Sequence, residues 1–245
     1  MRILAFDTAT RATTVALSER EGRVLEARDD PRPGARPGHV SRLLVLIADL
    51  LEQGQVGFAD LDRIAVGVGP GTFTGLRIGI ATARGLARAA SLPLVGVSTL
   101  RSLGVPAGPV ARERGAGAVA AVLDARRGEV FLAAWRLADL DGAGGEPLIS
   151  PRAIPPQAAA DSLQELGQAL LAVGDGAVEF RPILERSGVQ IPEDGSELHR
   201  VTAAAHLSIA QRLPAGHPEQ VQPEYLRLPD AREPGDVLAA LHEIE

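Results

Sequence analysis

The sequence predicts an α/β protein made of two related half-domains. Residues 3–6 form an apolar run that ends at Asp7, and a polar turn leads from there into a second apolar run. Residues 118–123 form another apolar run that ends at Asp124, and again a polar turn and an apolar run follow. Two short strands around a polar turn are typical of a hairpin. A unit that recurs about 117 residues later indicates an internal repeat.

Further elements follow along the chain in the alternation expected of an α/β fold. Short apolar runs predict strands, and apolar residues at helical spacing predict helices. The segment 29–38 holds three Pro and two Gly, which predicts a loop. In chain order we expect strands at 3–6, 14–17, 24–27, 64–68, 93–97, 118–123 and 129–135, and helices at 39–52, 74–90, 161–172 and 203–213.

The boundary between the two half-domains is expected in the segment 104–117, which is rich in Gly, Pro and Arg. Such segments are typical of linkers. We therefore expect a first half-domain at 1–103, a second at 104–230 and a polar C-terminal tail at 231–245.

The helix expected from His39 is apolar around most of its circumference. One apolar row follows helical spacing and consists of Val40, Leu44, Ile47 and Leu51, and further leucines form a second row beside it. A surface helix normally has a single apolar stripe. This helix is therefore expected to be covered on two sides.

The next expected helix carries a row of small residues four positions apart, namely Gly71, Gly75, Gly79, Ala83 and Ala87. Glycine inside a helix costs about 0.5–1 kcal/mol relative to alanine, so repeated glycine needs a reason. Two explanations stay open. The row packs closely on the sheet beneath it, or it lets a helix of a partner approach closely.

Composition excludes several classes of chemistry. The 245 residues contain no Cys, which excludes disulfides, zinc–thiolate sites and Cys nucleophiles. All 25 basic residues are Arg, so a phosphate-binding Walker lysine and a Schiff-base lysine are excluded as well. The four-residue apolar run at the N-terminus is too short for a signal peptide, and no apolar stretch is long enough to span a membrane. We expect a soluble cytoplasmic protein.

Charge is distributed unevenly along this acidic chain, whose net charge is −6. The segment 63–112 contains six Arg and no Asp or Glu. Arg77, Arg84 and Arg88 have helical spacing within it, so they are expected on one helix face. That face is either solvated or contacts an acidic partner or tRNA phosphates.

Signals of a catalytic or metal site are weak. The turn 69–75 precedes a helix, where free N–H groups bind phosphates, but Pro70 removes one N–H group and no nucleotide-binding spacing is met. The five His include no pair at the spacing of a helical metal site, so we expect no metal site. The sequence also lacks the G-x-S-x-G elbow of serine hydrolases, and we expect no catalytic residue.

Several motifs resemble the TsaB (YeaZ) family. The most specific is GVGPGTFTGLRIGIATARGLA at 67–87. The others, in order along nearly the whole chain, are DTATRATTVAL at 7–17, His39 at the start of an apolar helix, GVSTL at 96–100, DARRGEVF at 124–131, VGDGA at 173–177 and PEYLR at 223–227.

The resemblance implies a degenerate, non-catalytic ASKHA fold, the actin-like ATPase fold related to RNase H. Families with this fold place phosphate- or metal-directing groups in the two hairpins, which makes Asp7, Thr8, Thr10 and Asp124 the candidate cofactor residues. The third position of the family's D-x-G-[ST] pattern is Ala9 here, and Leu43 replaces the second His of the H-x-x-x-H metal motif of catalytic relatives. Both departures favour a chain without a cofactor of its own.

The resemblance further implies a scaffold that activates TsaD, the enzyme that transfers threonylcarbamoyl from its adenylate to the adenosine beside the anticodon of tRNAs. TsaD is then a direct partner, TsaE belongs to the same complex, tRNA binds only within that complex, and ATP and metal reside on TsaD and TsaE. The same surface is expected to serve TsaD binding and homodimer formation. Its expected residues are His39, Leu43, Leu44, Ile47, Leu51, Gly75, Gly79 and Ala83.

Two alternatives of other classes stay open. An active ASKHA-type small-molecule kinase or ATPase predicts direct nucleotide binding. A peptidase requires a metal pair or an activated nucleophile. Nucleotide titration of the isolated protein separates a scaffold from an ATPase.

Overall fold

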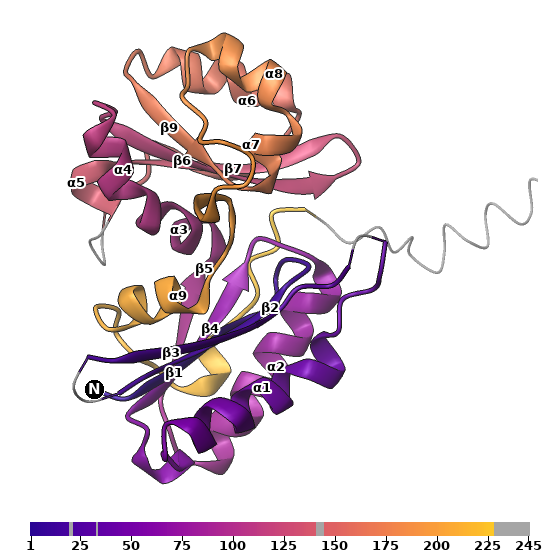
Figure 1. Cartoon of the computed structure of the whole chain (residues 1–245), viewed down its shortest axis with the longest axis vertical. Helices are drawn as coiled ribbons and strands as arrows, with labels where there is room; N and C mark the ends of the chain where they lie inside the picture. The colour runs from indigo at the N-terminus through magenta and orange to yellow at the C-terminus, as the bar shows by residue number, and fades with distance from the viewer. Residues whose placement is uncertain (20–21, 33, 141–144, 228–245) are drawn as a thin grey trace, which may run out of the picture.

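The computed structural model describes residues 1–227 except 20–21, 33 and 141–144. Its two lobes each contain one β-sheet, as Figure 1 shows. Among the described residues, no helix is long and apolar enough to cross a membrane. The expected tail at 231–245 lies outside the described residues.

The first sheet has five strands in the order β3-β2-β1-β4-β5. The strands β1, β2 and β3 are antiparallel to one another, whereas β4 and β5 run parallel to β1. The bounds are β1 Ile3–Asp7, β2 Thr13–Ser18, β3 Val24–Asp29, β4 Arg63–Gly69 and β5 Leu94–Ser98. Helices α1 (His39–Gln53) and α2 (Phe73–Ala89) cover one face, and α9 (Ala203–Ala210) covers the other.

The second sheet repeats this topology without the last strand, in the order β8-β7-β6-β9. Its strands are β6 Ala118–Arg126, β7 Glu129–Arg136, β8 Ile149–Ile154 and β9 Leu170–Val173. The surrounding helices are α3 Thr99–Gly104, α4 Gly108–Glu113, α5 Leu137–Leu140, α6 Pro156–Glu165, α7 Asp175–Glu179 and α8 Arg181–Leu184. The hairpin β6–β7 thus corresponds to β1–β2, which confirms the predicted repeat of two half-domains.

Two connections join the lobes before the last described residues, Leu226 and Arg227, return to the second lobe. Helix α3 leads from β5 into the second lobe, and the segment after His199 returns to the first. There α9 packs its apolar residues on Ile3, Ala5 and Val97. The division expected from the sequence places all of 104–230 in the second half, and for α9 it is wrong, because this apolar helix closes the otherwise open face of the first sheet.

Helix α1 is covered on one side only. Its inner residues lie in the core of the first lobe and comprise Leu43, Leu46, Ile47, Leu50 and Leu51. On the outer side of α1, Val40 is 79% exposed, Leu44 55% and Val45 43%. Of the expected partner residues on α1, only Leu44 therefore faces outward, and Leu43, Ile47 and Leu51 pack against the sheet. We call Val40, Leu44 and Val45 the outer stripe.

The small-residue row of α2 faces inward. A Cβ atom built on Gly75 would lie 2.0 Å from the backbone oxygen of Thr8, and one on Gly79 would lie 2.4 Å from Thr8 Oγ1. Ala83 is fully buried as well. The expectation that Gly75, Gly79 and Ala83 face a partner is therefore wrong, and the alternative of close packing inside the lobe is confirmed. The row is small because the β1–β2 turn presses directly on the helix.

A glycine on the opposite face of α2 provides a matched comparison. Gly85 is exposed, and a Cβ atom there would meet nothing within 4 Å. We predict that Gly75→Ala lowers the free energy of unfolding by about 1–3 kcal/mol through overpacking. Gly85→Ala should raise it by up to about 1 kcal/mol through helix propensity. Urea unfolding measures both, and equal effects of the two substitutions would contradict the inward packing.

Candidate functional site

The two lobes enclose a cleft at the ends of corresponding elements. The first lobe contributes the β1–β2 turn with Thr10 and Arg11, and the turn before α2 with Thr72. The second lobe contributes Asp124 from the β6–β7 hairpin and Asp175 from the start of α7. A cavity of about 210 Å³ lies on the side of Arg28 and His199. The repeat therefore brings equivalent turns of both halves to one place.

The acidic side of the cleft belongs to the second lobe. The Asp124 backbone N–H donates to Asp175 Oδ1 at 2.9 Å, and the Asp124 carboxylate pairs with Arg126 at 2.9 Å. The Asp175 side chain is exposed to solvent at the cleft, but the protein around its carboxylate partly desolvates it, and this desolvation, together with the charge of Asp124, raises the pKa of Asp175 above its ordinary value. His199 supports this turn from behind, since its Nδ1 accepts the N–H of Gly174 at 3.1 Å.

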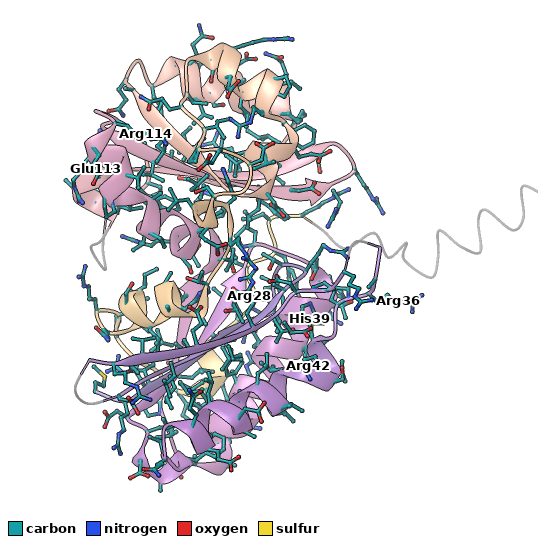
Figure 2. The ribbon with its side chains drawn as sticks, in the orientation of Figure 1. Arg28, Arg36, His39, Arg42, Glu113 and Arg114 are labelled. Atoms are coloured by element: carbon teal, nitrogen blue, oxygen red, sulfur yellow. The ribbon has the colours of Figure 1, made fainter. Side chains whose placement is uncertain are left out.

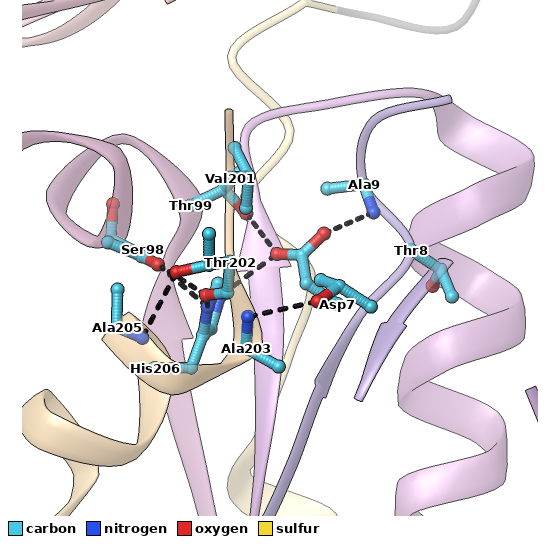
Figure 3. Close-up of polar contacts among 12 residues, drawn as sticks. Asp7, Thr8, Ala9, Ser98, Thr99, Val201, Thr202, Ala203, Ala205 and His206 are labelled. Atoms are coloured by element: carbon cyan, nitrogen blue, oxygen red, sulfur yellow. Dashed lines mark hydrogen bonds and ion pairs between the residues drawn. The ribbon is translucent and has the colours of Figure 1, made fainter. Parts of the chain in front are cut away.

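Asp7, the corresponding acid of the first lobe, is fully buried. Its Oδ1 accepts the N–H of Ala9 at 2.6 Å, its Oδ2 accepts the Thr99 hydroxyl at 2.8 Å, and His206 Nε2 lies 2.9 Å from Oδ2 (Figure 3). Burial alone would raise the pKa of Asp7, but the hydrogen bond and charge of His206, helped by Ala9 and Thr99, lower it below its ordinary value. The carboxylate is thus satisfied from within the chain.

The other side of the His206 ring contacts Ser102. His206 Nδ1 lies 2.7 Å from Ser102 Oγ and 2.9 Å from the Thr202 carbonyl oxygen. Ser102, His206 and Asp7 therefore stand in the order of a serine-hydrolase triad. However, all three residues are fully buried, so no substrate reaches the hydroxyl. The geometry serves structure, and it gives no support to a peptidase.

The remaining candidates differ in position. Thr10 and Asp124 both line the cleft, and a role of either residue in binding a cofactor stays a prediction. Thr8 is buried, and its hydroxyl donates to the Gly75 carbonyl oxygen at 2.7 Å, so it joins the turn to α2. His39 is buried too, with Nδ1 2.9 Å from Thr13 Oγ1, and burial lowers its pKa. The expectation that His39 belongs to an exposed partner surface is wrong, because it anchors the start of α1 to β2.

Arg77, Arg84 and Arg88 hold the last described segment against α2. The Arg77 guanidinium lies 3.8 Å from the centre of the Phe73 ring, and its Nε donates to the Tyr225 hydroxyl at 3.2 Å. Arg84 donates to the Val221 carbonyl oxygen at 2.5 Å, and Arg88 pairs with Glu219 at 2.5 Å. A contact of these arginines with tRNA or an acidic partner stays a prediction, and it would compete with these bonds.

The described part of the chain contains no cluster of side chains suited to bind a metal ion. No group of three or more His, Asp or Glu side chains is placed there to hold an ion. The Asp7–His206 contact was not predictable from the spacing of the sequence, since its members come from opposite ends of the chain. The sequence indicates buried polar contacts only through two features: Ser98 and Thr99 follow an apolar run, and His206 stands alone in an otherwise apolar segment.

Comparison with known proteins places these features in context. Residues 32–177 match the family model described as TsaD, tRNA N6-adenosine threonylcarbamoyltransferase. The chain is similar to the tRNA threonylcarbamoyladenosine biosynthesis protein TsaB of Escherichia coli (strain K12), with 37% identity over 198 residues that cover 81% of each chain.

Solved structures agree with this similarity. YeaZ from Pseudomonas aeruginosa superposes with a TM-score of 0.71 and 32% identity, covering 91% of this chain and 100% of that chain. The ROK hexokinase from Thermus thermophilus has a TM-score of 0.50 and 10% identity over 85% of this chain and 98% of its own, a likeness of fold alone. The predicted actin-like fold is confirmed.

The buried Asp7–His206 pair generates a prediction for stability. Removing one member of a buried pair costs about 3–5 kcal/mol, because the other charge is left uncompensated. We expect His206→Ala to lose that amount in urea unfolding at neutral pH, and Asp7→Asn combined with it to lose less than the sum. Asp30→Asn, in an exposed ion-pair cluster with Arg28 and Arg200, should cost about 0–1 kcal/mol and serves as the control.

The pH dependence of the same pair follows from the lowered pKa of Asp7. Its contribution to stability is complete above the unfolded value, 3.8, and is lost as the pH falls through the lower folded value. Asp7→Asn should remove this part of the acid-induced loss. An unchanged pH profile in that variant would show that Asp7 is not charged in the folded protein.

Proposed function

This chain belongs to the TsaB family, and we propose that it serves as a non-catalytic subunit that activates TsaD in the threonylcarbamoylation of tRNA adenosine beside the anticodon. The observation that carries the proposal is the uncovered outer stripe of α1. Val40, Leu44 and Val45 are exposed on a helix whose other side is already buried in the core. An exposed apolar patch of this kind usually marks an interface.

Several features support a subunit without its own chemistry. Asp7, the acidic residue of the first hairpin, is paired with His206, and the sequence contains no Lys to bind a phosphate. The Ser102 hydroxyl is sealed from solvent. ATP and metal are therefore assigned to the partners TsaD and TsaE, and titration with ATP distinguishes this proposal from an active ASKHA-type kinase or ATPase.

The proposed occupant of the outer stripe is TsaD. The TsaD family model matches residues 32–177, a range that includes both α1 and α2. A protein of that family therefore has counterparts of these helices, and the two chains are able to pair their equivalent faces in pseudo-symmetry. A homodimer through the same face would compete with this pairing. TsaE and tRNA join the assembly only once TsaD is bound.

The proposal is tested by reconstitution of tRNA modification. The purified chain alone should neither hydrolyse ATP nor modify tRNA. Added to TsaD, TsaE, ATP, threonylcarbamoyl-AMP and tRNA, it should raise the yield of threonylcarbamoyladenosine, measured by mass spectrometry of digested tRNA, at least tenfold. Turnover by a preparation free of TsaD and TsaE would overturn the scaffold assignment.

The interface itself is tested by charge placed on the outer stripe. A fully buried Leu contributes about 1.5–3 kcal/mol, so Leu44→Arg should weaken TsaD binding by about 10- to 100-fold while the fold stays intact. Val24→Arg on strand β3 is the matched control, since Val24 is 45% exposed and alternates with Leu25, which packs on the α1 side of the sheet. Ile47→Arg is unsuitable, because Ile47 is buried and the variant should unfold. Isothermal titration and circular dichroism give both readouts, and equal loss in the Val24 variant would refute the stripe as the interface.

A further inference from the structure

Unpaired cations gather where the chain enters α1. The side chains of Arg32 and Arg36 are exposed and form no hydrogen bond or ion pair with any residue that the structure describes; the Arg32 backbone oxygen accepts the N–H of Ala35 at 3.0 Å. Within the described ranges, the Arg11 side chain donates to the Ala35 carbonyl oxygen alone, at 2.7 Å. We call Arg11, Arg32 and Arg36 the basic loop, and Figure 2 shows Arg36 at its projecting end.

Acidic residues near the basic loop are already neutralised. Asp29 pairs with Arg42 at 3.2 Å, and Asp30 pairs with Arg28 at 2.8 Å and also with Arg200. Asp175 lines the same cavities as Arg11, so the excess of positive charge in the basic loop lies on Arg32 and Arg36. The basic loop continues directly into the outer stripe, which begins at Val40.

The described chain ends beside this surface. Arg227 Nη1 donates to the Ala125 carbonyl oxygen at 3.2 Å and pairs with Glu129 at 3.3 Å, which places the exit at the β6–β7 hairpin. The neighbours of Ala125, Asp124 and Arg126, line the same cavity as Arg11 of the basic loop. The remaining segment thus leaves the described part at the mouth of the cleft.

The segment 228–245 has the composition to fit that surface. It holds five acidic residues and one Arg, so it carries −4 of the total charge of −6. Its apolar residues recur at helical spacing, namely Val237, Leu238, Leu241 and Ile244. An acidic segment with an apolar stripe complements a basic loop followed by an apolar stripe.

We propose that residues 228–245 bind the outer stripe and the basic loop of their own chain and thereby compete with the partner. This inference rests on the proposed function for what the stripe binds, but the intramolecular contact stands independently of it. The nine residues 228–236 span at most about 30 Å when fully extended, which exceeds the length of α1, about 22 Å.

Tethering makes a weak contact effective. A short linker gives an effective concentration of about 1 mM, so a segment with an intrinsic Kd of about 0.1 mM is docked in about nine of ten molecules. Docking of that extent lowers the apparent affinity for a competing partner about tenfold. The acidic segment therefore sets a threshold for association without blocking it.

The contact is measurable in the full-length chain without any partner. Because the chain has no Cys, Ala240→Cys accepts a single spin label. We expect paramagnetic broadening of the backbone amides of residues 40–48, of 32 and of 34–36, and none on β3. Leu238→Ser with Leu241→Ser should abolish the broadening, whereas Ala239→Ser, a neighbour outside the apolar spacing, should preserve it. Broadening confined to other elements, or absent, would overturn the proposal.

A second measurement links the contact to association. Leu238→Ser with Leu241→Ser should raise the affinity for TsaD about tenfold, and Arg32→Ser with Arg36→Ser should weaken the broadening at low salt. If the unsubstituted chain shows the broadening but the Leu238→Ser, Leu241→Ser variant binds TsaD with unchanged affinity, the segment does not compete with TsaD and that part of the proposal is overturned. Complete absence of TsaD binding in every variant would instead count against the proposed function. If the Arg variants alter only tRNA binding, the basic loop serves RNA and the proposal fails.

Discussion

The architecture depends on one buried charge, the carboxylate of Asp7. A carboxylate without solvent requires compensation from within the protein, and here His206, Thr99 and the N–H of Ala9 supply it. Thr99 begins α3, and His206 belongs to α9, so both connections between the lobes converge on the end of β1. Ser102 adds a direct bond between the two connections. The pair that stabilises the first lobe therefore also fixes the place from which the second lobe extends.

The same constraint decides what the cleft offers. Asp7 stands at the end of β1, where a carboxylate without partners from the chain would be free to bind a cation. Here Asp7 pairs with His206 and is buried, while Asp124 and Asp175 line the cleft from the second lobe. Asp7 thus has a structural role, whereas Thr10 and Arg11 of the same lobe still line the cleft. Thr8 has a structural role too, since it lies against Gly75 and leaves no room between the turn and α2.

Local patterns predicted much of this fold, and long-range contacts explain what they missed. The two hairpins and the two helices of the first lobe were predictable, because periodicity and turn residues act over a few positions. The direction of the glycine row was not, since four-residue spacing is the same whether Gly75 and Gly79 face a sheet or a partner. Leu43, Leu44 and Ile47 were equally indistinguishable by hydropathy, and only the position of the sheet separates the buried residues from the exposed one. The approach of His206 to Asp7 joins distant segments and leaves no pattern in the sequence.

The buried polar residues of this chain serve its structure, so its surface residues are the ones available for binding. The buried side of α1 fixes the helix on the sheet, and this rigidity keeps Val40, Leu44 and Val45 in a fixed arrangement before any partner binds. A preformed apolar surface binds without an ordering cost, but it also invites self-association. Charge at the end of the same helix, in Arg32 and Arg36, then determines which segments are attracted to it. Under the proposed contact, the acidic segment 228–245 is tethered to the surface that it would cover, so a free partner has to compete with it for that surface.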